Sequence, residues 1–194
     1  PGTNSTKALK QAIASLPSHG GTIKLRRGLY GLEGSNKFTG LVNVTIAGSG
    51  DGWGSGFYAV PQPFLSQWRA LLEFASPQGL WIDNVEFDMR DQKIGCLRYW
   101  SDTDTLFSRL YCHDLGGAKV GDQRHWALAA IKGSTGSKDH REIGNYLARG
   151  WGNATPTGGV RGTWGPQDGT GVDGCLWEHI WSEEFGHTNL VPVA

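Results

Sequence analysis

The sequence predicts an all-β fold, and more narrowly a right-handed parallel β-helix of about five coils with a short N-terminal capping helix. Three observations support this prediction. Many apolar segments of three to five residues are separated by turns, glycine accounts for 30 of 194 residues, and a strand–corner–strand pattern recurs along the chain. Short strands divided by frequent turns suit a sandwich, a barrel or a solenoid, and an internal repeat favours the solenoid.

The repeat has an apolar anchor, a two-residue corner and a second strand with alternating apolar positions. The anchors recur at intervals of 25 to 36 residues, at Ile46, Ile82, Phe107, Ile143 and Trp177. A corner repeated at this spacing is expected once per coil of a solenoid, with coils about 4.8 Å apart. The anchors are therefore predicted to stack inside one parallel sheet.

The N-terminal residues 1–17 are predicted to contain a helix that caps the first coil, and residues 18–194 to form the coils of a single domain. Apolar residues at helical spacing define one face. Ser5 or Thr6 is suited to begin the helix and Pro17 to end it. The predicted buried face consists of Leu9, Ala12, Ile13 and Leu16.

Composition excludes several classes of protein. Lysine plus arginine and aspartate plus glutamate number 18 each, so the net charge is zero and nucleic acid is not an expected partner. No apolar run approaches the roughly 18 residues of a spanning helix, so a membrane is not expected either. The nine tryptophans are suited either to the core or to stacking on a sugar or base.

The three cysteines, Cys96, Cys112 and Cys175, show no metal-ligand spacing. Because their number is odd, they are not all paired with one another. Cys112 falls on the inward row with Phe87 and Ala148, which predicts a buried free thiol.

The first 50 residues resemble the start of pectate-lyase-like β-helix proteins. The likeness consists of the helix, the Gly20-Gly21 turn, the strand 22–25, the Gly28-Leu29-Tyr30 turn and the segment 43–48. This superfamily includes polysaccharide lyases, polygalacturonase-like hydrolases and phage tailspikes. The resemblance therefore implies a polysaccharide partner, an extracellular or virion-associated location, and a monomer or homotrimer. About five coils is fewer than usual, so the chain is also read as a possible fragment of a longer protein.

Six residues beyond each of the last four anchors the repeat places an ionisable side chain, at Asp88, His113, Arg149 and Glu183. Stacked coils would bring these side chains to one edge of a sheet, where the longest loops follow. The resemblance implies that such loops flank a substrate groove. The candidate acid–base residues are Asp88, Asp91, His113, Asp114, Asp122, Arg124 and His125, and the candidate substrate-binding residues are Arg149, Trp126, Trp151 and Trp164.

These residue types suit two reactions. Paired carboxylates can hydrolyse a glycoside, whereas an arginine or lysine base beside carboxylate-bound calcium can eliminate across a uronic acid. Calcium is thus a possible cofactor, and no metal site is assigned. The alternative function is a non-catalytic glycan-binding or adhesin domain in which tryptophans are the binding surfaces.

Two further segments have alternative interpretations. Asp102 and Asp104 alternate as calcium ligands do, although an Asp-rich turn between strands is favoured. The segment 48–64, with Trp53, Phe57 and Tyr58, is interpreted either as a wall of the groove or as a contact with a neighbouring chain.

Overall fold

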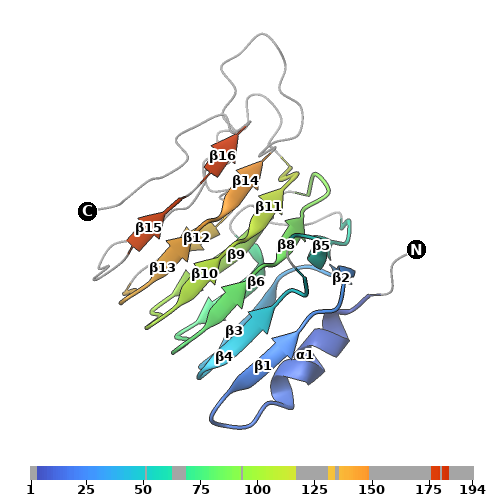
Figure 1. Ribbon diagram of the computed structural model, residues 1–194. Coiled ribbons are helices and arrows are strands. Elements are labelled where there is room, and N and C mark those ends of the chain that lie inside the picture. Colours follow the sequence, from blue (N-terminus) through green and yellow to red (C-terminus); the bar gives the residue numbers. More distant parts are fainter. Residues whose placement is uncertain are drawn as a thin grey trace.

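The computed structural model is mostly β, with parallel sheets and one short helix (Figure 1). None of the helical residues it describes forms a segment long and apolar enough to cross a bilayer. The residues that the structure describes are 4–50, 52–62, 69–92, 94–116, 131–133, 136–148, 176–179 and 181–183.

The described strands form three parallel sheets. The first sheet has the order β1 (Gly21–Lys24), β4 (Val44–Ala47), β7 (Trp81–Asp83), β10 (Leu106–Ser108), β13 (Arg141–Ile143) and β15 (Leu176–Glu178). The second sheet has the order β2 (Gly28–Leu32), β5 (Ser55–Ala59), β8 (Glu86–Asp88), β11 (Tyr111–His113), β14 (Tyr146–Ala148) and β16 (Trp181–Glu183). The third sheet has the order β3 (Asn36–Thr39), β6 (Ala70–Ala75), β9 (Gly95–Trp100) and β12 (Ile131–Gly133).

The chain visits the three sheets in turn. Strands β1, β2 and β3 each begin a different sheet, and β4, β5 and β6 pair beside them in the same order. Every strand pair formed by these elements is parallel, as the repeat predicts. Segments 23 or more residues apart in sequence are therefore direct neighbours in space.

The predicted stack of anchors is confirmed in its first three members and wrong in the fourth. Ile46 pairs with Ile82, and Ile82 with Phe107. Phe107 then pairs with Glu142 rather than Ile143, and Glu142 pairs with Trp177. The predicted register differs by one residue because the inward residue at this position is the buried carboxylate Glu142 and not an apolar side chain.

The corner between the first and second sheets explains this register. The residue after each of β7, β10, β13 and β15 has a left-handed backbone: Asn84 (φ 54°), Arg109 (φ 53°), Gly144 (φ 67°) and His179 (φ 52°). Asparagine and glycine adopt this conformation more readily than other residues. Gly144 therefore occupies the position of Asn84 and Arg109, whereas the predicted anchor Ile143 would assign this position to Asn145.

Helix α1 (Thr6–Ala14) lies beside β1 at the N-terminal end of the stack, as predicted (Figure 1). Leu9 is buried, and Ile13 and Leu16 pack against the core. The helix start differs from the prediction, because neither the Ser5 nor the Thr6 side chain caps it. Asn4 Oδ1 instead accepts a hydrogen bond from the Thr6 N–H at 2.9 Å.

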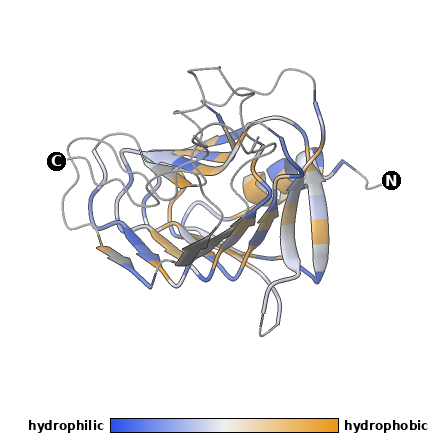
Figure 2. Cartoon of the chain, turned by 90° about the horizontal axis from the view of Figure 1, so that it is seen from above, coloured by the Kyte–Doolittle hydropathy of each residue, from blue (hydrophilic) through white to orange (hydrophobic). Residues whose placement is uncertain are grey.

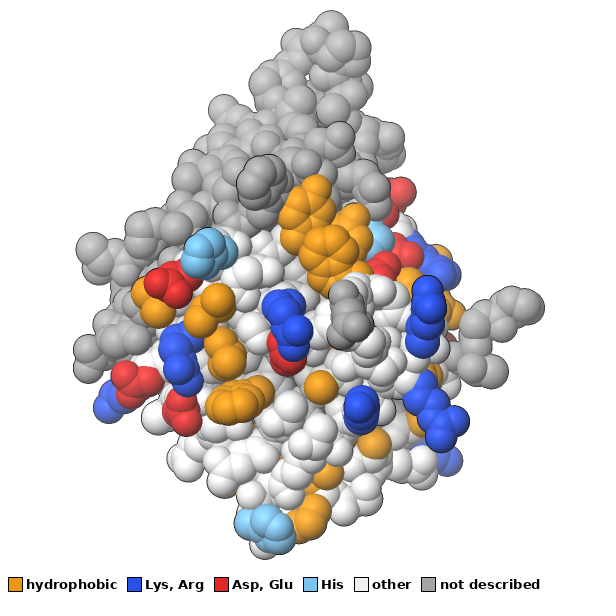
Figure 3. Space-filling model, in the orientation of Figure 1, with side chains coloured by type: hydrophobic (Ala, Val, Ile, Leu, Met, Phe, Trp, Pro, Cys, Tyr) orange, Lys and Arg blue, Asp and Glu red, His pale blue; other side chains and the backbone are white. Residues whose placement is uncertain are grey.

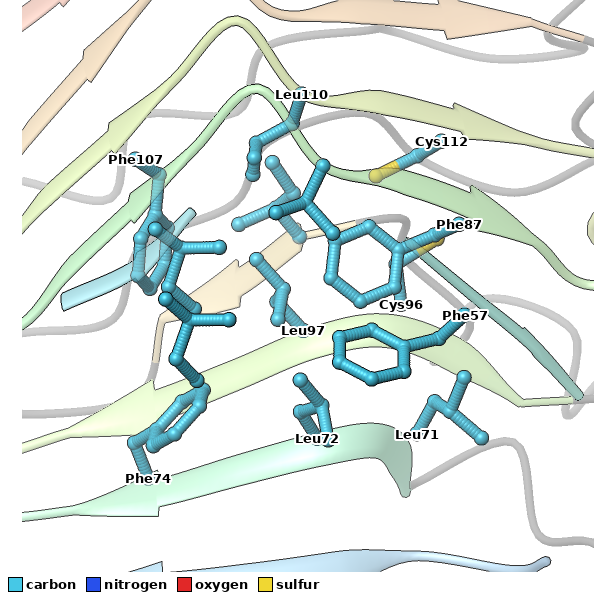
Figure 4. Packing of buried hydrophobic residues seen from close by; sticks show 14 of the residues in the cluster. Phe57, Leu71, Leu72, Phe74, Phe87, Cys96, Leu97, Phe107, Leu110 and Cys112 are labelled. Carbon is cyan, nitrogen blue, oxygen red and sulfur yellow. The ribbon is translucent and has the colours of Figure 1, made fainter. Parts of the chain in front are cut away.

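Hydrophobic and hydrophilic residues alternate along the strands, as expected for sheets with one face toward a core (Figure 2). Side chains from all three sheets meet inside the stack (Figure 4). The labelled contributors include Phe57 and Phe87 of the second sheet, whose ring centroids are 5.8 Å apart. Removing these side chains from water is the main stabilising contribution.

The core also contains a polar cluster centred on His140. The ring is fully buried and stacks on Tyr99 with centroids 4.0 Å apart. Its Nδ1 lies 2.8 Å from Asp102 Oδ2, and its Nε2 lies 3.3 Å from Glu142 Oε1. The Tyr99 hydroxyl donates to the same Glu142 oxygen at 3.4 Å. Glu142 thus faces inward because it has two buried donors.

This cluster fixes the charge state of its histidine. Burial alone would lower the pKa of His140, but hydrogen bonds to Asp102 and Glu142, together with their charges, raise it to about 9. Burial would raise the pKa of Asp102, but the hydrogen bond and the charge of His140, together with smaller contributions from Ser137 and Thr105, lower it below its usual value. Asp102 is therefore a core residue, while Asp104 lies in the turn and pairs with Arg141.

The cysteine prediction is confirmed for the described residues. Cys112 is a buried free thiol in register with Phe87, and Cys96 is likewise buried and free. The residue paired with Cys112 on the next strand is Leu147 rather than Ala148, by the same one-residue displacement. Cys175 lies outside the described residues.

Candidate active site on the second sheet

Alternate residues of the second sheet form a polar outer face. Phe87 and Cys112 pair with each other and point into the core. Because side chains alternate along a strand, the residues on either side of them face outward. Glu86 and Asp88 of β8 therefore share one surface with Tyr111 and His113 of β11.

A histidine flanked by carboxylates lies at the centre of this face. His113 Nδ1 is 2.8 Å from Asp114 Oδ2, and His113 Nε2 is 3.1 Å from Glu86 Oε1. The His113 side chain is only 8% exposed, whereas those of Glu86 and Asp114 are 16% and 30% exposed. When both ring nitrogens carry a proton, the ring donates to both carboxylates at once.

Asp88 completes this group, and we call Glu86, Asp88, His113 and Asp114 the His113 cluster. Asp88 and His113 are in register on neighbouring strands, and polar atoms of Asp88, His113 and Asp114 all lie within 4.8 Å of one another. Arg90 donates from its backbone N–H to Asp88 Oδ1 at 3.0 Å, and its Nε lies 3.4 Å from Asp88 Oδ2.

Aromatic rings adjoin the His113 cluster. Tyr111 stacks on His113 with ring centroids 4.3 Å apart. Trp53, from the segment before β5, stacks on Tyr111 at 4.5 Å and on Tyr146 at 5.4 Å. Figure 3 shows a hydrophobic group beside histidine and acidic side chains on this surface. The face therefore combines acid–base groups with flat apolar surface.

The described residues fit calcium poorly. Asp88, His113 and Asp114 would supply two carboxylates and one imidazole nitrogen. Calcium takes six to eight oxygen ligands, whereas imidazole suits zinc, copper or iron. Both nitrogens of His113 already contact carboxylates. The donor set is therefore better suited to proton transfer than to holding calcium.

The structure brings together Asp88, His113 and Asp114, three of the predicted acid–base residues. Asp91 is exposed in the turn after β8, and its backbone N–H donates to the Asp114 carbonyl oxygen at 2.7 Å. The other predicted residues lie outside the described part of the chain: Asp122, Arg124, His125, Trp126, Arg149, Trp151 and Trp164.

The placement of Arg149 in the stacked row is wrong. Ala148 is the residue in register with His113, and Ala148 pairs in turn with Glu183. The displacement is the same single residue that places Glu142 rather than Ile143 opposite Phe107. The described row is thus Tyr58, Asp88, His113, Ala148 and Glu183.

Two residues of this site were not singled out as site residues from the sequence. Glu86 precedes Asp88 by two positions and therefore shares its face, so strand periodicity alone was a usable signal. Tyr111 has the same relation to His113. Trp53 reaches this face from the segment between β4 and β5, and no repeat position indicates which strand it contacts.

Comparison with known proteins identifies the fold alone. No family model and no curated protein matches the sequence. A protein of Parabacteroides merdae ATCC 43184, named a "putative glycosyl hydrolase", is similar in structure with a TM-score of 0.58 and 12% identity, covering 96% of this chain and 91% of its own.

A second solved structure, Geobacillus virus E2 ORF18, has a TM-score of 0.52 and 16% identity over 92% of this chain. The present chain covers 47% of that viral protein, so it spans about half of its length. At 12% and 16% identity, both likenesses concern the fold alone.

Proposed function

We propose that the chain is a right-handed parallel β-helix of the pectate-lyase-like superfamily that hydrolyses a polysaccharide on the outer face of its second sheet. Three parallel sheets visited in turn support the fold. The likeness to a protein named a glycosyl hydrolase supports the substrate class. The observation that carries the activity is the His113 cluster, with three carboxylates around one histidine.

Hydrolysis is favoured over elimination by the chemistry of the described side chains. An eliminating enzyme needs a base and positive charge to stabilise a uronate, and the cluster instead presents three carboxylates. Its described cation, Arg90, is paired with Asp88. Carboxylate pairs are the usual machinery of glycoside hydrolysis.

The spacing suggests which carboxylates react. Oxygens of Asp88 and Asp114 lie within 4.8 Å, closer to the roughly 5–5.5 Å separation of retaining enzymes than to the wider inverting arrangement. In this scheme Asp88 attacks the anomeric carbon, while Asp114 protonates the departing glycosidic oxygen. Asp114 then takes a proton from the water that cleaves the glycosyl ester, which restores both groups.

His113 and Glu86 have positioning roles in this scheme. His113 contacts Asp114 at one nitrogen and Glu86 at the other, so it fixes the Asp114 carboxyl against the sheet. Orientation of this kind is a large part of acid–base catalysis. Glu86 holds the ring in turn.

The direct test is a polysaccharide panel assayed in two ways. Hydrolysis releases reducing ends without absorbance at 235 nm, whereas elimination yields an unsaturated product that absorbs there. We expect reducing ends alone, with the anomeric configuration of the substrate retained in the first product seen by NMR. An absorbing product would contradict hydrolysis.

A glycan-binding domain without turnover is the second candidate. The structural likeness to a viral protein and the exposed Trp53 favour it. Binding to the panel without product of either kind would select it. An extracellular or virion location, and a monomeric or trimeric state, accompany both candidates as proposals.

A further inference from the structure

Trp53 has a fixed position on the outer face of the second sheet. Its ring lies against Tyr111 with an interplanar angle of 29° and against Tyr146 with an angle of 19°. Its Nε1 donates to the Arg109 carbonyl oxygen at 3.2 Å, which anchors the ring at the corner before β11. Three contacts from two neighbouring coils thus set the orientation of one side chain.

The same ring remains open to solvent. Trp53 is 46% exposed although it packs on two tyrosines. A tryptophan of the core would be buried. Trp53 is instead exposed while two ring contacts and one hydrogen bond hold its side chain in place. A rigid, exposed aromatic surface binds at low cost in conformational entropy, because the protein has already ordered it.

The surroundings indicate what this surface would bind. Tyr111 touches Trp53 on one side and His113 on the other, so the aromatic surface leads directly to the His113 cluster. A pyranose has an apolar C–H face and a rim of hydroxyl groups. Stacking its face on an indole would leave the hydroxyls for carboxylate acceptors such as Glu86.

The local charge selects among sugars. The cluster has three carboxylates, and two arginines near it in the described part of the chain are engaged with acids, Arg90 with Asp88 and Arg109 with Asp83. A uronate placed here would meet like charges, which disfavours its binding. A neutral sugar would meet hydrogen-bond acceptors instead.

We propose that Trp53 is the stacking platform of a subsite for a neutral pyranose beside the His113 cluster. This inference rests on the proposed function for its substrate class. It makes Trp53 a binding residue rather than a catalytic one, and it ranks neutral glycans above polyuronates as ligands.

The test compares Trp53→Ala with Trp81→Ala by calorimetric titration. Trp81 is a matched control, since it is 45% exposed and lies on the first sheet. The ligands are neutral hexasaccharides (gluco-, manno- and xylo-configured) and a hexauronate. We expect Trp53→Ala to weaken neutral-glycan binding roughly 5- to 10-fold. Trp81→Ala should bind as the native protein does, and Trp53→Phe should fall between.

Several results would overturn the proposal. These are equal effects of Trp53→Ala and Trp81→Ala, tighter binding of the hexauronate, or no binding of any neutral ligand. The proposed hydrolysis is judged separately by product release. Turnover without sensitivity to Trp53→Ala would refute the platform alone, while Trp53-dependent binding without turnover would refute the hydrolysis alone.

Discussion

At the residue scale, the outer face of the second sheet depends on which of two alternating positions carries a polar side chain. Phe87 and Cys112 fill the core positions, so Glu86, Asp88 and His113 are directed to the same outer surface. Asp88, His113 and Asp114 are candidates from the sequence that the structure brings together, and their catalytic role stays a prediction. Glu86 was not among the candidates from the sequence. The repeat singles out the last residue of the strand, Asp88, whereas Glu86 is the first residue of the same strand.

The thiols provide a residue-scale prediction. Cys96 and Cys112 are fully buried, and burial together with the neighbouring Cys112 thiol raises the pKa of Cys96 well above its usual value. Because the thiolate is the reactive form, neither should react with an aromatic disulfide reagent in the native protein. Both should react after denaturation. Rapid native modification of Cys112, located by peptide mass analysis, would contradict the core assignment.

The buried histidine predicts a pH dependence of stability. The pKa of His140 is about 9 in the folded protein and about 6.5 when unfolded, so the folded state binds the proton more tightly. This contribution, on the order of 3 kcal/mol, is fully present below pH 6.5 and is lost as the pH rises through 9. Urea unfolding from pH 6 to 10 should show the decline.

An independent measurement checks the same group. Titration of the His140 ring protons by NMR should give a pKa near 9 in the native protein. A value near 6.5, or unfolding free energies that stay level from pH 6.5 to 9, would show that Asp102 and Glu142 do not hold the charged ring.

At the element scale, corners determine register. The sequence correctly predicted short parallel strands, because apolar segments and turns are local signals. It displaced the fourth anchor by one residue because Gly144 and Asn145 both suit a turn. The structure uses Gly144 as the left-handed residue and buries Asn145, whose Oδ1 accepts a hydrogen bond from the Leu110 N–H at 3.0 Å. Side-chain contacts between neighbouring segments of the sheets decided this, and they are not visible in the sequence of one repeat.

Close packing of β5 on β8 gives an element-scale prediction. A Cβ at Gly56 would lie 1.9 Å from the Glu86 carbonyl oxygen. Gly56→Ala should therefore destabilise the protein by roughly 1–3 kcal/mol through forced backbone movement, measured by urea unfolding. It should also reduce turnover, because Glu86 would shift away from His113.

Gly52→Ala is the matched control, since a Cβ there would meet nothing within 4 Å. Its stability should stay within about 0.5 kcal/mol of the native protein. If both glycine variants lower the free energy of unfolding equally, the close approach of Gly56 to the Glu86 carbonyl oxygen is not the cause of the destabilisation.

At the scale of the whole molecule, stacking converts a repeat in sequence into a surface. Residues 25 apart, such as Asp88 and His113, become neighbours because β8 and β11 pair in register. The same stacking brings Trp53 against Tyr111 and Tyr146 of the neighbouring strands β11 and β14. A sequence repeat predicts contacts between equivalent strand residues such as Asp88 and His113. The contacts of Trp53 depend instead on the path of the segment between β4 and β5.

Hydrolysis at the His113 cluster is tested most directly by measuring the turnover of variants on a polysaccharide that the native protein cleaves. Asp88→Asn and His113→Ala are compared with His19→Ala, whose histidine is exposed near the N-terminal helix. We predict that the first two lower the release of reducing ends by roughly 10²- to 10⁴-fold while retaining glycan binding, and that His19→Ala matches the native rate. Native turnover in both Asp88→Asn and His113→Ala would contradict the account.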